Sequence, residues 1–202
     1  MTRNHQELLT EEGEAFIQEL CSILGSRQQV DGFIEEYGIK EFRGGSYGRR
    51  IFSFPDSMVH DEFIGETELE TFYVIKASGD PIAHNCREIR VWQKACELGW
   101  EHESLFAPID AWDAGDYRWL IMRRVTPVSP HKGDTAYLLS GQEYVYNPEA
   151  PECMEDKLNE LGWVVEDVEI NVGMLYEGLC MMDYGGVDRK DSSIEPPKWR
   201  DN

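Results

Sequence analysis

Apolar residues recur at helical spacing near the start of the chain. In the segment Thr10–Leu24 they fall on one face of a helix, with Thr10 placed as a typical N-terminal cap and Gly25 just beyond the last apolar position. The segment Ser26–Tyr37 repeats this pattern and stops at Gly38. We therefore expect two consecutive amphipathic helices.

The pattern then changes to that of extended chain. Gly44–Gly48 separates two extended segments, Arg50–Phe54 alternates between polar and apolar residues, and Pro55–Ser57 is typical of a turn, which together predict a β-hairpin. Thr71–Lys76 predicts a third strand. A Gly-Asp-Pro break follows, and Ile82–Leu98 predicts a long helix. The residues expected on its inward face are Ile89, Val91, Trp92 and Ala95.

Two more hairpins are expected further along the chain. The first joins strands at Ala107–Asp113 and Tyr117–Met122 through the tight turn Ala114–Asp116. The second joins strands at Val172–Leu175 and Gly178–Met182. Each pair of apolar runs is short enough for strands and is separated by turn residues.

The remaining segments are less regular. Thr126–Glu149 is rich in proline, glycine and polar residues and predicts no particular element, whereas Glu152–Leu161 predicts a short helix. The segment Asp188–Asn202 is polar and contains Pro196-Pro197, so we expect it to be irregular.

The composition indicates a cytoplasmic, soluble protein. A chain of 202 residues with 41% hydrophobic residues suffices for one domain or one domain of two lobes. Met1–Glu14 is too polar for a signal peptide, and no apolar run approaches the length of a membrane span. The five cysteines are scattered and form no Cys-x-x-Cys pair, so neither a disulfide framework nor a zinc site is predicted.

The net charge is −20 at pH 7, with 39 acidic and 19 basic residues. This excess disfavours a nucleic-acid partner, because phosphate backbones bind clustered Lys and Arg. Carboxylates spread along the whole chain are typical of a halophile's protein, and solubility alone needs a net charge of only about 2–8. An ordinary acidic protein is the alternative.

Several short motifs follow one another in an order typical of a known fold. A glycine-rich hairpin precedes a strand ending in Lys76, a helix carrying Glu88, a further hairpin, Asn171-Val172-Gly173, and an apolar strand ending in Asp183-Tyr184-Gly185. This order resembles the protein-kinase superfamily, in particular the small, divergent kinase-like proteins of microbes and viruses. The resemblance covers residues 42–186 and depends on order and spacing more than on any one motif.

The resemblance implies an α+β, minimal protein-kinase-like fold. It would combine an antiparallel-sheet N-lobe containing one long helix with a truncated C-lobe. The expected segments, in order, are an N-terminal helical segment, the N-lobe up to its hinge, the reduced C-lobe and a polar tail: residues 1–40, 41–125, 126–188 and 189–202.

The resemblance also implies a phosphate-binding set. Gly45 and Gly48 would let backbone amides approach the phosphates, although Arg43 stands where the family has a further glycine. Lys76 would grip the α- and β-phosphates of ATP and pair with Glu88, twelve residues later. The alternative for the glycines is a plain hairpin turn. The alternatives for Lys76 and Glu88 are a structural ion pair, or a surface helix charge in the case of Glu88.

Adenine and magnesium would be bound by other segments. Met122 would be the gatekeeper residue, and the backbone of Arg123, Arg124 and Val125 would contact the adenine. Asn171 and Asp183 would hold Mg²⁺. The structural alternative for the segment containing Met122 is a buried strand, and the alternative for Asp183 is a turn at the end of a strand.

The sequence departs from the family at the catalytic loop. The His-Arg-Asp signature is absent, and Glu166 stands at the position of the catalytic Asp, with Asp167 next to it. Either carboxylate could orient an acceptor hydroxyl. Only seventeen residues follow Gly185, without the Ala-Pro-Glu motif, so a conventional peptide-substrate lobe is not expected.

Three hypotheses follow. The first is an ATP- and Mg²⁺-dependent phosphotransferase of unknown acceptor. The second is a pseudokinase that binds nucleotide or docks to a protein partner. The third is a structural α+β protein whose motif order is coincidental.

Overall fold

The computed structural model describes most of the first half of the chain and shorter stretches beyond it. The described residues are 5–42, 48–65, 70–81, 83–99, 105–129, 135–138, 143–145, 154–156, 158–159, 163–164, 171–175, 178–185 and 188–189. The chain divides into two units, Met1–Asn85 with Pro108–Arg124, and Cys86–Ala107 with Val125–Asn202. No helix among the described residues has both the length and the apolar content needed to cross a membrane.

Three helices begin the first unit. They are α1 (His5–Leu8), α2 (Glu11–Ile23) and α3 (Arg27–Tyr37). The hydroxyl of Thr10 caps α2 by accepting a hydrogen bond from the N–H of Gly13 at 3.1 Å, and Ser26 caps α3 in the same way through Gln29 at 3.5 Å. α3 ends at Gly38, whose φ of 62° is left-handed. Both predicted helices are confirmed.

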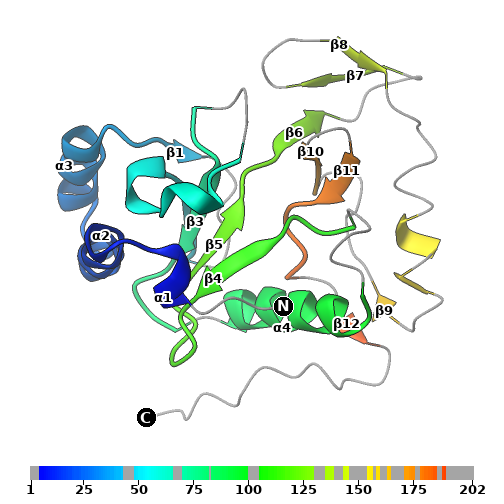
Figure 1. The fold of residues 1–202 in the computed structure, drawn as a ribbon, viewed down its shortest axis with the longest axis horizontal. Helices are drawn as coiled ribbons and strands as arrows, with labels where there is room; N and C mark the ends of the chain where they lie inside the picture. Colours follow the sequence, from blue (N-terminus) through cyan, green and yellow to red (C-terminus); the bar gives the residue numbers. More distant parts are fainter. Residues whose placement is uncertain are drawn as a thin grey trace. The chain divides into compact units, whose positions relative to one another are not determined.

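Five antiparallel strands form the sheet of the first unit, in the order β1-β2-β3-β5-β4 (Figure 1). Their bounds are β1 (Glu41–Phe42), β2 (Arg50–Phe54), β3 (Tyr73–Ala77), β4 (Ile109–Trp112) and β5 (Trp119–Arg123). The two hairpins predicted for this region are present, as β1–β2 and β4–β5. The predicted third strand is β3, which lies between β2 and β5 at the centre of the sheet. The prediction of an α+β protein is therefore confirmed at this coarse level.

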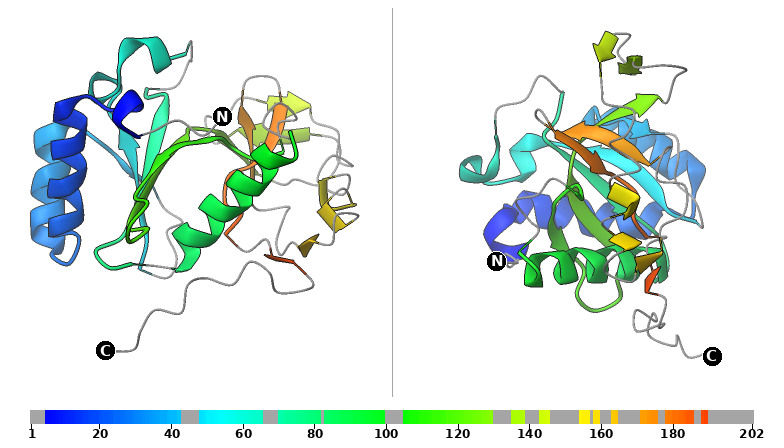
Figure 2. Two further views of the ribbon diagram at one scale, coloured as in Figure 1. Left: turned by 60° about the horizontal axis from the view of Figure 1, so that its bottom comes forward. Right: turned by 90° about the vertical axis from the view of Figure 1, so that its right-hand side faces the viewer.

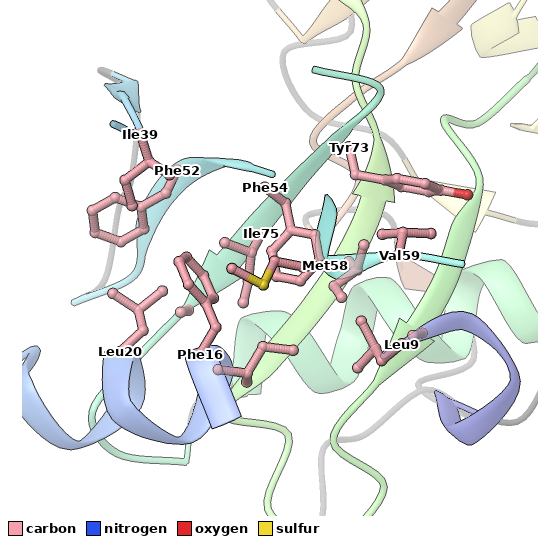
Figure 3. Close-up of a cluster of buried hydrophobic side chains, with 14 of the residues drawn as sticks. Leu9, Phe16, Leu20, Ile39, Phe52, Phe54, Met58, Val59, Tyr73 and Ile75 are labelled. Atoms are coloured by element: carbon pink, nitrogen blue, oxygen red, sulfur yellow. The ribbon is translucent and has the colours of Figure 1, made fainter. Parts of the chain in front are cut away.

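One face of this sheet packs against α2 and α3 (Figures 1 and 2). Phe52, Ile75 and Ile121 form a row of register partners across β2, β3 and β5. All three are buried in one cluster with Phe16 of α2 and Phe33 of α3, whose ring centroids lie 4.9 Å apart. Figure 3 shows Phe16, Phe52 and Ile75 of this cluster. Full burial of each such side chain contributes about 1.5–3 kcal/mol, so this cluster is the main source of stability for the unit.

The start of α2 contacts the first of two short 3-10 turns that follow β2. These turns are η1 (Asp56–Met58) and η2 (Asp61–Phe63). Leu9 forms an isolated β-bridge with Val59, and the N–H of Thr10 donates to the carbonyl oxygen of Met58 at 3.1 Å. A Cβ added to Gly13 would lie 2.3 Å from that same oxygen. Glycine at this position therefore allows the close approach of the two segments.

The second unit contains a separate sheet, in the order β11-β10-β6-β7-β8. Its strands are β6 (Thr126–Ser129), β7 (Thr135–Leu138), β8 (Glu143–Val145), β10 (Val172–Leu175) and β11 (Gly178–Met181). The final predicted hairpin is confirmed as β10–β11. Strands β6, β7 and β8 lie in the segment for which no element was predicted.

A two-stranded ladder pairs β9 (Trp163–Val164) with β12 (Asp188–Arg189). The prediction of irregular structure from Asp188 onward was therefore wrong for Asp188 and Arg189. Their backbone groups pair with a distant strand, which local composition does not reveal.

The long predicted helix is confirmed as α4 (Ala83–Glu97), which ends one residue before the predicted Leu98, and the predicted first residue, Ile82, lies outside the described residues. Its residues predicted to face inward, Ile89, Val91, Trp92 and Ala95, are all buried. Residues 154–156 and 158–159 are helical, within the short helix predicted around them.

Candidate functional site

Lys76 is buried in the central strand of the first sheet, with 2% of its surface exposed. Its register partners are Ile51 on β2 and Leu120 on β5. Because side chains alternate along a strand, Lys76 points away from the face that carries Ile75, α2 and α3. Burial of an ammonium group is costly unless polar or charged groups hold it. A lysine at this position is therefore a candidate for binding an anion.

The predicted gatekeeper, Met122, lies on the same face of the sheet as Lys76. Met122 pairs directly with Val74, which precedes Lys76 by two residues on β3, and it is 1% exposed. Residues opposite one another, and residues two apart on a strand, share a face. The sheet thus brings two of the predicted site residues to one side.

Gly48 and Arg49 lead into β2 at the end of the sheet where Lys76 lies. Gly48 has a φ of 79°, a conformation that glycine adopts without strain. Arg49 is 2% exposed and directly precedes β2. Arg49 was not among the predicted site residues. The other predicted glycine, Gly45, lies outside the described residues.

Asn85 connects Arg49 to the turn between β4 and β5. It is fully buried in the first turn of α4, and its Oδ1 accepts a hydrogen bond from Nη1 of Arg49 at 3.4 Å. Its Nδ2 donates to the carbonyl oxygen of Tyr117 at 3.0 Å. Among the described residues other than glycine, Tyr117 alone has a positive φ, of 56°. Asn85 therefore orients Arg49 relative to a turn of unusual backbone conformation.

In the second unit, α4 holds the Asp183-Tyr184-Gly185 segment. A carboxylate oxygen of Glu88 accepts a hydrogen bond from the backbone N–H of Tyr184 at 3.2 Å, and both residues are fully buried. Nη1 of Arg87 donates to the carbonyl oxygen of Gly185 at 3.3 Å. Two consecutive helix residues thus bind two consecutive residues of the predicted metal motif. Arg87 was not predicted to take part.

The side chain of Tyr184 has specific contacts of its own. Its hydroxyl donates a hydrogen bond to the carbonyl oxygen of Ala107 at 2.8 Å. Its ring lies against Phe106, with ring centroids 4.7 Å apart. Tyrosine therefore supplies a buried hydrogen bond that phenylalanine would lack.

The β10–β11 hairpin brings Asn171 and Asp183 to one end. Val172 pairs with Met181, and the N–H of Met182 donates to the carbonyl oxygen of Asn171 at 2.8 Å, immediately before Asp183. Amide and carboxylate oxygens suit Mg²⁺, which binds proteins through one or two carboxylates and completes its shell with water or phosphate oxygens. The predicted Mg²⁺-binding role of Asn171 and Asp183 stays a prediction. Clusters of three or more His, Cys, Asp or Glu able to hold a metal are absent from the described residues.

Gly173 of the Asn-x-Gly motif has a packing role. A Cβ at this position would lie 2.8 Å from Cγ2 of Val125 and 2.9 Å from the carbonyl oxygen of Thr126. The glycine thus lets β10 approach the start of β6. Val125 is buried here, and the predicted contact of its backbone with adenine stays a prediction.

Other predicted features are not tested by the structure. Lys76 belongs to the first unit and Glu88 to the second, so their ion pair stays a prediction. The proposed bases Glu166 and Asp167 lie outside the described residues.

Cysteine chemistry is disfavoured at two buried positions. Burial raises the pKa of Cys180 to about 12 and the pKa of Cys21 to about 11. Near neutral pH both thiols are protonated, and the thiolate is the nucleophilic form.

No protein-family model matches this chain, and no curated protein matches it.

Proposed function

We propose that this chain is an ATP- and Mg²⁺-binding protein with a minimal protein-kinase-like fold, and that it transfers a phosphoryl group. The observation that supports this most strongly is the hydrogen bond from the N–H of Tyr184 to Glu88. The helix glutamate and the Asp-Tyr-Gly motif are 96 residues apart in the chain. Both were expected in one site, and a direct buried contact between them supports that expectation.

The first sheet gives a second line of support. Lys76 and Met122 share a buried face, and the glycine-containing segment before β2 lies at the end of β3 that carries Lys76. In the proposal, Lys76 binds the α- and β-phosphates of ATP, and the segment ending at Gly48 supplies backbone N–H groups.

The acceptor side of the reaction is assigned to the second unit. Asn171 and Asp183 would hold Mg²⁺, which neutralises charge on the phosphates when bound. Glu166 or Asp167 would accept the proton of the acceptor hydroxyl. The hydroxyl oxygen bonds to the γ-phosphorus, the bond from that phosphorus to the β-phosphate oxygen breaks, and ADP leaves.

ATP binding tests the proposal first. Lys76→Met keeps the methylene packing but removes the charge and the donors, so we expect at least about a 10-fold loss of ATP affinity. Lys94→Met is the matched control, because Lys94 is exposed on α4 and pairs with Glu97. Calorimetric titrations with and without Mg²⁺ should also show that binding needs the metal, since the protein and the triphosphate are both anionic. Equal ATP affinity in the parent and Lys76→Met would refute the site.

Phosphoryl transfer is tested separately. Asp183→Asn should abolish ATP turnover, because it removes charge from the metal site. Of Glu166→Gln and Asp167→Asn, only one should be severe, because consecutive loop residues point in different directions. ATP consumption and autophosphorylation are the measurements. A parent that binds ATP without turnover would be a pseudokinase, and turnover that survives Asp183→Asn would exclude the metal motif.

A further inference from the structure

Two consecutive residues of α4 hold the segment that follows Asp183. A carboxylate oxygen of Glu88 accepts a hydrogen bond from the N–H of Tyr184 at 3.2 Å. Nη1 of Arg87 donates to the carbonyl oxygen of Gly185 at 3.3 Å. All five residues belong to the second unit. Glu88 already has a predicted role in the site, so the open question is what the contact made by Arg87 does.

Gly185 is the residue of this segment that most needs to be held. It is buried, and a buried carbonyl oxygen needs a hydrogen-bond donor, which Arg87 supplies. Glycine also has the widest range of backbone conformations and loses the most entropy when it is fixed. The hydrogen bond from Arg87 therefore restricts the backbone two residues after Asp183, at the point where the chain is otherwise least restricted.

Arg87 extends from a firmly packed part of α4. The neighbouring residues Ile89 and Val91 are fully buried, and the side chain of Arg87 is half-buried. Its Nε is buried without a hydrogen-bond partner among the described residues. Burial of an N–H group without an acceptor costs free energy, so an arginine is a poor choice here for stability alone. This favours a role for Arg87 at the segment that it contacts.

The segment held in this way carries a carboxylate that a cation can reach. Asp183 is half-buried and directly precedes Tyr184. Mg²⁺ demands near-ideal octahedral geometry, so its affinity depends on how well each oxygen ligand is oriented. Groups that only orient a ligand can change metal affinity by about 10–100-fold.

We infer that Arg87 is a positioning residue for Asp183: its hydrogen bond to Gly185 fixes the segment that carries the carboxylate and raises the affinity of the site for a divalent cation. This inference rests on the proposed function, in which Asp183 is a ligand of Mg²⁺. Arg87 itself does not touch the cation or the nucleotide.

The sign of the expected effect separates positioning from simple electrostatics. A guanidinium repels a nearby divalent cation, so loss of the positive charge would by itself strengthen cation binding. Loss of positioning acts in the opposite direction. A variant of Arg87 that binds the cation more weakly has therefore lost the orientation of the ligand, and the change in charge does not account for the result.

The test measures Mn²⁺ binding directly, without a turnover assay. Mn²⁺ takes oxygen ligands as Mg²⁺ does, and the loss of its free electron paramagnetic resonance signal reports binding. The titrations use the parent, Arg87→Met, Arg87→Lys, Lys94→Met and Asp183→Asn at one fixed KCl concentration. Because a chain with a net charge of −20 also binds cations across its surface, Asp183→Asn gives the background to subtract. Unfolding midpoints are measured for every variant.

Arg87→Met should weaken the Asp183-dependent binding of Mn²⁺ by about 10-fold or more. Arg87→Lys keeps the charge but lacks the planar fork of donors, so its affinity should fall between those of the parent and Arg87→Met. Lys94→Met is the matched control, because it removes one positive charge from an exposed position of the same helix. Its affinity should stay within about twofold of the parent's.

Failure of the inference is distinguishable from failure of the proposed function. A parent whose Mn²⁺ binding is unaffected by Asp183→Asn refutes the metal site, and the role of Arg87 with it. Asp183-dependent binding that is equal or tighter in Arg87→Met refutes the role of Arg87 alone, and a lowered unfolding midpoint in that variant would then assign Arg87 to the fold. Where Arg87→Met does not fold, Arg87→Lys decides by the same criterion. Failure of both to fold, while Lys94→Met folds, overturns the inference.

Discussion

Two glycines within the N-terminal helices have different surroundings. Gly13 of α2 lies against the backbone of Met58, and a Cβ there would be 2.3 Å from a carbonyl oxygen. Gly32 of α3 has no atom within 4 Å of the position of its Cβ. Both lie inside helices, where alanine is the better residue by about 0.5–1 kcal/mol. The two glycines therefore differ in whether a methyl group would clash with a neighbouring segment: it would at Gly13 and would not at Gly32.

This difference gives a paired prediction. Gly13→Ala should destabilise the protein by about 1–3 kcal/mol, because the backbone of α2 or η1 must shift to admit the methyl group. Gly32→Ala should stabilise it by about 0.5–1 kcal/mol. Urea denaturation of both variants measures the free energy of unfolding. Equal effects in the two variants would show that α2 does not approach Met58 as described.

Single residues also show where sequence reasoning reached its limit. Lys76 and Glu88 were predicted from the resemblance, as the lysine that ends an apolar strand and the glutamate on the following helix, and both are buried. Arg49 and Arg50 are adjacent and chemically identical, so only the three-dimensional structure separates the buried Arg49 from the half-buried Arg50. Asn85 was missed for the same reason, since its two hydrogen-bond partners are distant in the chain.

At the scale of elements, local signals predicted the structure well where they were strong. The caps Thr10 and Ser26 and the left-handed Gly38 set the bounds of α2 and α3 within a residue or two. Strands β6, β7 and β8 were missed because their segment is rich in turn residues. Pro127 in β6 argues against a strand, yet it pairs with Gly173 of β10, while β6 meets β7 only at Val128 and Ser129.

The contact between Tyr184 and the chain before β4 permits a prediction at this scale. Tyr184→Phe keeps the ring packing but leaves the buried carbonyl oxygen of Ala107 without its donor, which should cost about 1–3 kcal/mol of stability. Tyr37→Phe is the control, because the Tyr37 hydroxyl lies 3.4 Å from an exposed Glu19 carboxylate. That variant should keep the parent's unfolding midpoint. Matching midpoints for Tyr184→Phe and the parent would contradict the buried hydrogen bond.

At the scale of the whole molecule, charge dominates. Ion pairs form at exposed positions, such as Arg27 with Asp31 and Lys40 with Glu70. The whole chain has 39 acidic residues and only 19 basic ones, so most carboxylates have no basic residue to pair with. Such pairs contribute only about 0–1 kcal/mol each, and they leave a net charge of −20 uncompensated. Repulsion among the remaining carboxylates opposes the folded state, because folding brings them closer together.

Salt should therefore strengthen folding. Counterions at 1 M screen charges over a Debye length of only about 3 Å, so carboxylate repulsion fades between about 0.1 M and 3 M KCl. The melting temperature should rise across that range, as expected for a halophile's protein. Potassium chloride is the suitable salt, because chloride is only weakly excluded from protein surfaces and adds little general stabilisation. A melting temperature that stays flat or falls would show that the surface charge does not limit stability, and the acidic composition would then need another explanation.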